Sequence, residues 1–258
     1  MTPLLRTEGL DVTYGAVRAL DGVDLEVPEA CLLGLIGPNG AGKTTFIDAL
    51  SGFAPARGRV TFRGREITAL GPQHRARLGL GRTWQAVELF DDLTVRENLQ
   101  VAAERPTVRG VLADLLRPHR ARDRHEVDAA LDAVGISDLA GRSPAELSHG
   151  ERKLVGVARA LAAGPALLCL DEPAAGLDSA ESRRLGAQLR RIVDGGTSIL
   201  LVDHDMGLVL DVCDRVVVLD EGAVIADGSP SEVQRSPEVL QAYLGVGGGV
   251  SDPGGEGP

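Results

Sequence analysis

The chain has 258 residues, of which 43% are hydrophobic and only 3% aromatic, and its formal net charge is −10. This length and composition predict one large α/β domain, with or without a sub-domain, around an aliphatic core. The negative charge argues against a protein that binds nucleic acid over its whole surface. No apolar run approaches the ~18 residues of a membrane helix, and no basic-then-apolar signal opens the chain. We therefore expect an intracellular protein, unless a partner holds it at a membrane.

The three cysteines are far apart, lie in apolar segments and form no C-x-x-C pair: Cys31, Cys169 and Cys213. Their spacing gives no sign of a metal site or of a redox motif. We interpret them as reduced core residues.

The first part of the chain predicts antiparallel strands. Apolar side chains alternate with others over 10–14 and again over 23–27, which is the period of a half-buried strand. Asp21 and Gly22 form a turn signal between these segments. The apolar run 31–36 then predicts a buried strand, and 58–64 predicts another strand bounded by glycines.

A phosphate-binding loop follows the strand at 31–36. Nine residues fit the pattern G-x-x-x-x-G-K-[ST] and its continuation: Gly37, Pro38, Asn39, Gly40, Ala41, Gly42, Lys43, Thr44 and Thr45. The glycines let the backbone turn and approach an anion, and successive N–H groups then point at phosphate oxygens from the start of a helix. In this pattern Lys43 reaches the β- and γ-phosphates and the Thr44 hydroxyl ligates Mg²⁺. The segment therefore predicts a nucleoside triphosphate site.

From 71 to about 145 the pattern predicts helices. Thr94 and Glu97 form a capping-box signal at the start of a short helix over 95–103. Over 104–125, apolar residues recur at helical spacing among six arginines and only three acidic residues. Two interpretations of this basic stretch remain open: a solvated face of a small helical sub-domain, or a contact with an acidic partner or a membrane surface.

After residue 146 strands and helices alternate. Strands over 166–170, 198–202 and 216–219 alternate with helices over 179–194 and 206–213, which predicts βαβ units and a parallel sheet. A strand over 223–226 and helical segments over 230–243 close the fold. The Gly/Pro-rich tail 245–258 is predicted to be disordered.

Polar residues follow two of these strands. Asp171 and Glu172 come directly after 166–170, and an acid at the end of a strand beside a phosphate loop can support Mg²⁺. Because neighbours in a strand alternate in direction, Glu172 points elsewhere, which suits a group that orients or deprotonates the attacking water. His204 follows the strand at 198–202, on the side of the sheet where doubly wound folds bind ligands, and could donate to the γ-phosphate. Alternatively its role is structural, with the two flanking aspartates as its ion-pair partners.

Residues 147–151 read Leu-Ser-His-Gly-Glu and precede both a helix, predicted over 152–163, and the Asp171 strand. This segment is similar to the LSGGQ signature of ATP-binding-cassette (ABC) ATPases, and with the phosphate loop the chain resembles that family over residues 4 to about 244. The resemblance implies an α/β fold of the ABC P-loop NTPase type, with a mixed core sheet, an antiparallel β subdomain and a helical signature subdomain. It implies one ABC ATPase domain over 4–244, with the helical subdomain at about 71–163.

The resemblance also implies roles for individual residues. The phosphate loop binds ATP, and Mg²⁺ is held by Thr44, Gln85 and Asp171. Glu172 is the catalytic base, and His204 is the switch histidine. Tyr14 stacks on adenine. Asp178, at the end of the loop 175–178, acts toward a second subunit, and Ser148 and Gly150 contact the ATP bound by that subunit. Two cassettes then pack head to tail around ATP, so a monomer is nearly inactive.

The signature departs from the family pattern at two positions. His149 replaces its first glycine and Glu151 its glutamine, whereas Ser148 and Gly150 are retained. We expect activity to survive, since the other catalytic residues are present, and trans binding of ATP to be slightly altered.

Within the family, the chain is most similar to ATPase subunits of bacterial importers for branched-chain amino acids and related amides. The similarity lies in the segments 79–85, 89–99, 204–206 and 242–245 and in the helical insertion near 104–125. The resemblance implies a second ATPase subunit, integral membrane permease subunits and, indirectly, a solute-binding protein as partners, and no nucleic acid. It implies a cytoplasmic position on the inner face of the membrane. The solute is chosen by the partners.

Two other functions are compatible with a phosphate loop. Soluble cassette ATPases that act on ribosomes or DNA usually carry two cassettes, or a coiled-coil or zinc insertion, and the interval from Thr45 to Leu147 has neither heptads nor cysteine. A small-molecule kinase needs a substrate pocket and lid where this chain has the signature segment.

Overall fold

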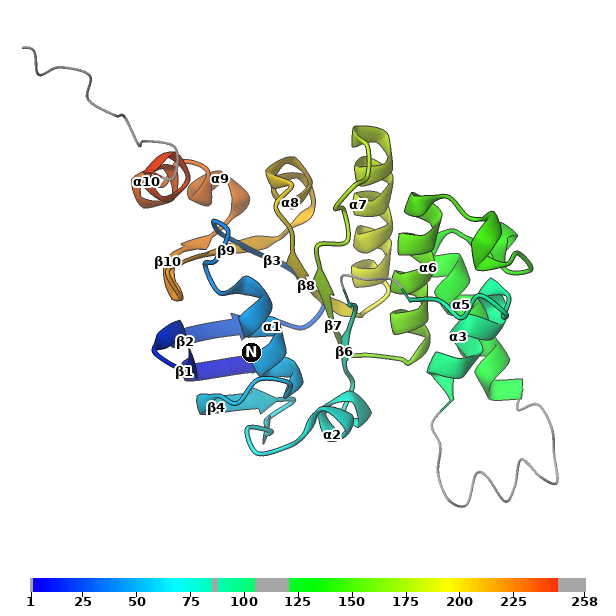
Figure 1. The fold of residues 1–258 in the computed structure, drawn as a ribbon, viewed down its shortest axis with the longest axis horizontal. Helices are drawn as coiled ribbons and strands as arrows, with labels where there is room; N and C mark the ends of the chain where they lie inside the picture. Colours follow the sequence, from blue (N-terminus) through cyan, green and yellow to red (C-terminus); the bar gives the residue numbers. More distant parts are fainter. Residues whose placement is uncertain (1, 85–87, 105–120, 246–258) are drawn as a thin grey trace, which may run out of the picture.

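The computed structural model describes residues 2–84, 88–104 and 121–245. Within these ranges the chain forms two sheets with helices around them (Figure 1). Gln85, most of the basic stretch at 104–125 and the predicted disordered tail beyond Gly245 lie outside the described residues. None of the helices in the described ranges combines the length and apolarity that crossing a membrane requires.

The first sheet is antiparallel, as the alternating pattern near the N-terminus predicts. Its strand order is β2-β1-β4-β5. The strands are β1 (Leu5–Tyr14), β2 (Val17–Val27), β4 (Arg57–Phe62) and β5 (Arg65–Glu66). One face of β1 and β2 is buried and the other is largely exposed, which explains why period-two alternation was visible in the sequence.

The second sheet holds the six other strands in the order β10-β9-β3-β8-β7-β6. All its pairs are parallel except that of β10 with β9, so the sheet is mixed. The strands are β3 (Leu32–Ile36), β6 (Leu80–Arg82), β7 (Leu167–Asp171), β8 (Ser198–Val202), β9 (Arg215–Asp220) and β10 (Ala223–Gly228). Every residue of β3, β7 and β8 is buried, as expected for parallel strands covered on both faces.

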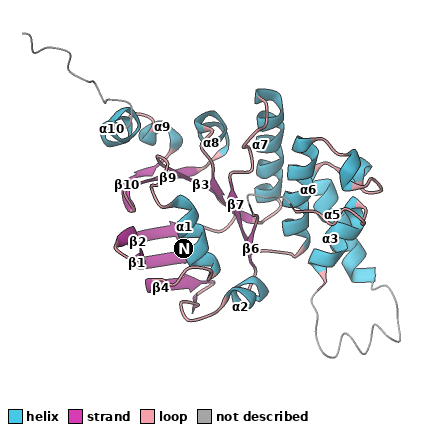
Figure 2. Ribbon diagram, in the orientation of Figure 1, coloured by secondary structure: helices cyan, strands magenta, loops and turns pink. Residues whose placement is uncertain are grey.

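Helices cover both faces of this sheet (Figure 2). One core lies between the sheet and α3 (Val95–Ala103), α5 (Ala121–Val134), α6 (His149–Ala162), α7 (Ser179–Asp194) and α8 (Met206–Val212). The other lies between the opposite face, the antiparallel sheet and α1 (Lys43–Ser51). The remaining elements are α2 (Pro72–Arg77), the short 3₁₀ turns Ser137–Leu139 and Pro144–Glu146, α9 (Pro230–Val233) and α10 (Pro237–Gly245).

Two details differ from the sequence-based prediction. β6 is a strand within the segment expected to be only helical, and it pairs in parallel with β7. Helix α6 begins at His149, three residues earlier than expected, because Ser148 caps it. The helical segments expected over 230–243 are α9 and α10, and α10 begins at Pro237, which has no N–H with which to continue a preceding helix.

Candidate functional site

The loop between β3 and α1 has the backbone that an anion cradle requires. Gly40 and Gly42 have φ of +85° and +100°, values that side chains rarely allow. A β-carbon at Gly37 would lie 2.0 Å from the carbonyl oxygen of Leu219, and one at Gly42 would lie 2.5 Å from that of Ala19. The pattern glycines are therefore required by the fold as well as by any ligand.

Helix α1 begins at Lys43 with no side chain capping its N-terminus and no acidic residue in its first turn. Its free N–H groups and positive dipole end remain available to phosphate oxygens. Lys43 Nζ donates to the carbonyl oxygens of Gly37 and Pro38 at 2.8 and 2.9 Å, across the loop. Burial lowers the pKa of Lys43, and the carboxylates of Glu172 and Asp171 oppose this effect. The loop thus holds a buried cation beside two acids.

Asp171, the last residue of β7, lies almost wholly buried at this loop. Burial raises its pKa to about 6, while the guanidinium of Arg82 acts in the opposite direction. The nearby Thr44 hydroxyl acts to lower the pKa of this carboxyl, and one carboxylate oxygen, Oδ1, is buried without a hydrogen-bond partner. An unpartnered carboxylate oxygen beside a threonine hydroxyl fits a divalent cation, because Mg²⁺ is usually bound by one or two carboxylates together with substrate phosphates.

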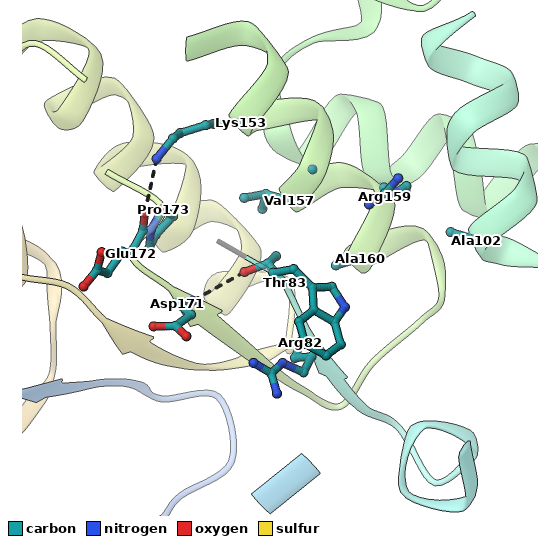
Figure 3. Close-up of a pocket in the computed structure, with 12 residues that line it drawn as sticks. Arg82, Thr83, Ala102, Lys153, Val157, Arg159, Ala160, Asp171, Glu172 and Pro173 are labelled. Carbon is teal, nitrogen blue, oxygen red and sulfur yellow. Dashed lines mark hydrogen bonds between the residues drawn. The ribbon is translucent and has the colours of Figure 1, made fainter. Parts of the chain in front are cut away.

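Glu172 has the strained backbone that often marks a functional residue. Its φ is +50°, an uncommon conformation for a residue with a β-carbon. Its N–H donates to the carbonyl of Val202 in β8 at 2.7 Å, and its own carbonyl accepts from Lys153 Nζ at 3.2 Å. The turn ends β7 abruptly, and Figure 3 shows the carboxylates of Glu172 and Asp171 next to each other on the same side of it.

His204 follows β8 with a side chain that is 60% exposed, and its Nδ1 lies 3.8 Å from Oδ1 of the flanking Asp203. Asp203 is buried, and the sequence indicated it only as a possible ion-pair partner of His204. Asp203 accepts from the N–H of Ala174 and from that of Asp205, both at 3.0 Å. It therefore ties the loop after β7 to the loop after β8. The sequence feature that could have indicated this link is the position of the residue, directly after a buried strand and shortly before the cap of the next helix.

Tyr14 lies at the end of β1, paired with Val17, and its ring is about half exposed. An exposed aromatic ring on the antiparallel sheet offers a stacking surface for a base, as the resemblance implies.

The predicted signature residues lie on α6, against α7. Ser148 Oγ accepts from Glu151 N, and Glu151 accepts from Ser148 N at 2.7 Å, forming a complete capping box. The backbone N–H of Ser148 accordingly lowers the pKa of Glu151. Glu151, which replaces the family's glutamine, thus closes the cap. Gly150 is buried against Glu181 of α7, where a β-carbon would meet Oε1 at 2.6 Å.

Asp178 caps α7, and its carboxylate accepts from the N–H groups of Ala180 and Glu181 at 2.7 and 2.8 Å. The structure therefore forms two groups. The phosphate loop, Asp171 and Glu172 share one site at the ends of β3 and β7. Ser148, Gly150 and Asp178 share another surface at the starts of α6 and α7. Gln85 lies outside the described residues.

A cavity of about 220 Å³ lies beside the acid pair, between β6, β7 and α6 (Figure 3). Its lining combines acids and cations with apolar groups and includes Arg82, Trp84, Lys153, Asp171 and Glu172. Arg82 is ion-paired to Asp48 at 2.6 Å and lies 4.1 Å from the Trp84 ring.

Comparison with known proteins agrees with this arrangement. The model of the ABC transporter family matches residues 20–175, and that of the branched-chain amino acid ATP-binding cassette transporter family matches residues 223–248. The first match covers more than half of the chain. The chain belongs to the ABC transporter family. The ABC P-loop NTPase fold predicted from the sequence is confirmed, and a family ATPase binds ATP and hydrolyses it to drive transport.

Relatives within the ABC family cover nearly the whole chain. It is 40% identical over 252 residues to the high-affinity branched-chain amino acid transport ATP-binding protein LivG of Salmonella typhimurium, covering 94% of this chain and 98% of that protein. It is 38% identical over 250 residues to BraF of Pseudomonas aeruginosa, a protein with the same description, with the same coverage. Its structure is similar to the ADP conformation of an ATP-binding cassette of an ABC transporter, with a TM-score of 0.82 at 30% identity, covering 95% of this chain and 100% of that chain. These similarities do not favour a soluble cassette ATPase of ribosomes or DNA.

Proposed function

We propose that this chain is the ATP-hydrolysing subunit of an importer for branched-chain amino acids or related small polar solutes. The relatives LivG and BraF are described as branched-chain amino acid transport proteins, and the C-terminal match is to the same class. As an importer ATPase it works with membrane permease subunits at the inner face of the membrane, and indirectly with a solute-binding protein. The solute itself is selected by those partners.

For hydrolysis, the loop Gly37–Thr45 binds the triphosphate and Lys43 neutralises its β- and γ-phosphates. Thr44 and Asp171, with Gln85, are the residues that hold Mg²⁺, which when bound offsets negative charge on the phosphates. Glu172 orients the attacking water and accepts its proton. His204, exposed at the end of β8, donates a hydrogen bond to the γ-phosphate, and Tyr14 stacks on adenine.

The surface formed by Ser148, Gly150 and Asp178 serves the second ATPase subunit. These residues lie at the N-termini of α6 and α7, whereas the cis phosphate site lies at the ends of β3 and β7. This separation supports a composite site in which each ATP is held by the phosphate loop of one chain and the signature of the other. Loss of the γ-phosphate then weakens the closed pair, and the opening drives the permease subunits.

The observation that carries this proposal is the placement of Glu172, in a strained conformation directly after Asp171 and close enough to Lys43 to influence its pKa. Its test is Glu172→Gln, which keeps the shape of the side chain but cannot accept the proton. We expect the ATPase rate of the purified full chain to fall by roughly 10²–10⁴-fold, the usual contribution of a general base, with ATP binding retained and an ATP-dependent dimer accumulating in size-exclusion chromatography.

Glu221→Gln is the matched control, because Glu221 is also a glutamate at positive φ, in the β9–β10 turn. It should hydrolyse ATP at the wild-type rate. Wild-type hydrolysis by Glu172→Gln would show that the base is another group. The transport proposal is tested separately, by restoring leucine uptake in cells that lack a branched-chain importer ATPase but retain its permease subunits. If leucine uptake is not restored although the chain hydrolyses ATP, the proposed substrate class is wrong and the proposed ATPase activity stands.

A further inference from the structure

Lys153 connects the signature helix to the backbone of the proposed catalytic base. It lies in α6, five residues after the cap Ser148, and its Nζ donates to the carbonyl oxygen of Glu172 at 3.2 Å. Figure 3 shows this side chain reaching from α6 to the turn that ends β7. The chain has 25 arginines and only two lysines, and each of these lysines donates to a backbone carbonyl at the predicted site.

The contact holds a part of the chain that is otherwise unfavourable. Glu172 has a φ of +50°, so its peptide units need support from both sides. On one side its N–H is bound to Val202 of β8 at 2.7 Å. On the other side its carbonyl accepts from two donors, Lys153 Nζ and the N–H of Ala175, both at 3.2 Å. Removal of the Lys153 ammonium would leave this carbonyl bonded to the N–H of Ala175, a bond inside the same turn, and would remove its tie to α6, so the peptide after Glu172 and the side chain would be less firmly held.

The surroundings of Lys153 suit a fixed donor. The residue is 8% exposed, and burial lowers its pKa while the carboxylates of Asp203 and Glu172 oppose this effect. A buried ammonium is costly unless it is hydrogen-bonded, and bonds from a charged donor are stronger than neutral ones. Lys153 therefore gains from the same contact that restrains Glu172.

We propose that Lys153 is a positioning residue for Glu172, and that through it the orientation of α6 sets the alignment of the catalytic base. The inference rests on the proposed function, since it takes Glu172 as the base and Ser148 and Gly150 as contacts for the ATP of a second subunit. Helix α6 packs on α3 and α5 as well as on β6 and β7. A shift of α6 caused by ATP at its N-terminus then moves Nζ relative to β7, and the two ATP sites of the pair become coupled.

The test compares Lys153→Met, which removes the donor but keeps an unbranched side chain, with Lys153→Arg, which keeps a donor. Because small misplacements of a catalytic group can cost ~100-fold, we expect Lys153→Met to lower kcat at least about tenfold with KM for ATP nearly unchanged. Lys153→Arg should recover most of the rate. Arg190→Met is the matched control: Arg190 also donates to a backbone carbonyl, that of Val212, away from the site. It should lose stability but not kcat.

A double substitution separates positioning from a merely structural role. In the Glu172→Gln background, Lys153→Met should leave the residual rate unchanged, since no base remains to be aligned. An equal loss of rate in both backgrounds would overturn the inference. If Lys153→Met fails to fold, Lys153→Leu, which also removes the donor, replaces it in the same cycle.

The inference and the proposed function fail in different ways. If Glu172→Gln hydrolysed ATP at the wild-type rate, the proposed base would be wrong and Lys153 would have nothing to align. If Glu172→Gln lost activity while Lys153→Met kept the wild-type kcat, the inference alone would be wrong.

Discussion

Gly150 in α6 and Glu181 in α7 are packed so closely that a β-carbon on Gly150 would lie 2.6 Å from Oε1 of Glu181. The other carboxylate oxygen of Glu181, Oε2, accepts from the N–H of Asp178 at 3.0 Å and completes the cap of α7. The start of the signature helix and the start of α7 therefore share one carboxylate. The effect of a substitution at either residue on stability should therefore depend on the residue present at the other.

The coupling should change the sign of the effect that Gly150→Ala has on the free energy of unfolding, depending on whether Glu181 is present. Alanine gains about 0.5–1 kcal/mol of helix propensity over glycine, while overpacking usually costs about 1–3 kcal/mol. In the wild-type background we expect the overpacking cost to exceed the gain in helix propensity, so that the free energy of unfolding falls by about 1 kcal/mol. In the Glu181→Ala background the clash is gone, and the same change should stabilise. Urea unfolding of the four proteins measures both effects, and additive values would contradict the coupling.

The cap formed by Asp205 should make part of the stability depend on pH. Its carboxylate accepts from Leu208 N at 3.1 Å and from Ser182 Oγ at 2.8 Å, so it joins α8 to α7. The first of these bonds is the main cause of its lowered pKa. A lowered folded-state pKa gives stability that is present above the unfolded value near 3.9 and is lost as pH falls through the folded value.

We therefore expect Asp205→Ala to lower the free energy of unfolding by about 1–2 kcal/mol at pH 7, the usual cost of a lost cap, and by less below pH ~4. Asp211→Ala, an exposed aspartate of the same helix, is the control and should change stability by less than about 0.5 kcal/mol. Denaturant titrations at pH 7 and pH 3.5 measure the difference. A loss that did not shrink on acidification would assign the effect to packing.

Several parts of the site could be predicted from sequence because their signals are local. The phosphate loop is a run of nine neighbours, and the α7 boundaries follow from Asp178 and the periodic apolar face behind it. The capping box at Thr94 and Glu97 was readable for the same reason, and the structure confirms it.

The missed features depend on distant partners. β6 has three residues, too few for a periodic pattern, and it becomes a strand only by pairing with β7 more than eighty residues later. The buried carboxylate of Asp203 and the contact of Lys153 with Glu172 likewise exist only once β7, β8 and α6 have met. Their residue types are ordinary in sequence, and their roles come from tertiary packing.

Two glycines of the phosphate loop should separate steric clash from backbone strain. Gly42 has a φ of +100° and a β-carbon there would meet a backbone carbonyl at 2.5 Å, whereas Gly40 has a φ of +85° with open space around it. Gly40→Ala should therefore cost only the strain, about 1 kcal/mol, and Gly42→Ala at least about 3 kcal/mol because the clashing carbonyl cannot rotate away. Thermal unfolding without nucleotide measures both, and equal losses would contradict the distinction.

The three cysteines should be unreactive in the folded protein. All three are buried, and burial raises the pKa of Cys169 to about 12. At pH 8 the thiolate form of such a group is roughly one part in 10⁴, and the thiolate is the form that reacts. Iodoacetamide should label all three in guanidinium chloride and none within the same time in buffer, as measured by mass spectrometry. Fast labelling of the native chain would place a thiol at the surface.

The contacts of Arg82 can be followed by the fluorescence of Trp84, the only tryptophan of the chain. The Arg82 guanidinium lies 4.1 Å from the Trp84 ring and 5.4 Å from that of Phe53, and it is paired with Asp48 at 2.6 Å. Because Asp48 is 29% exposed in its side chain and can be hydrated, removing Arg82 should cost less than the 3–5 kcal/mol typical of a fully buried pair, about 1–3 kcal/mol.

Arg82→Met should also expose the indole face, shift the tryptophan emission to longer wavelength and increase quenching by acrylamide. Arg77→Met, at an exposed position in α2, is the matched control and should leave emission and stability unchanged. Unaltered emission in Arg82→Met would show that the cation does not cover the ring in solution. A shift in emission with unchanged stability would show that the ion pair with Asp48 contributes nothing, so the two readouts test the two contacts of Arg82 separately.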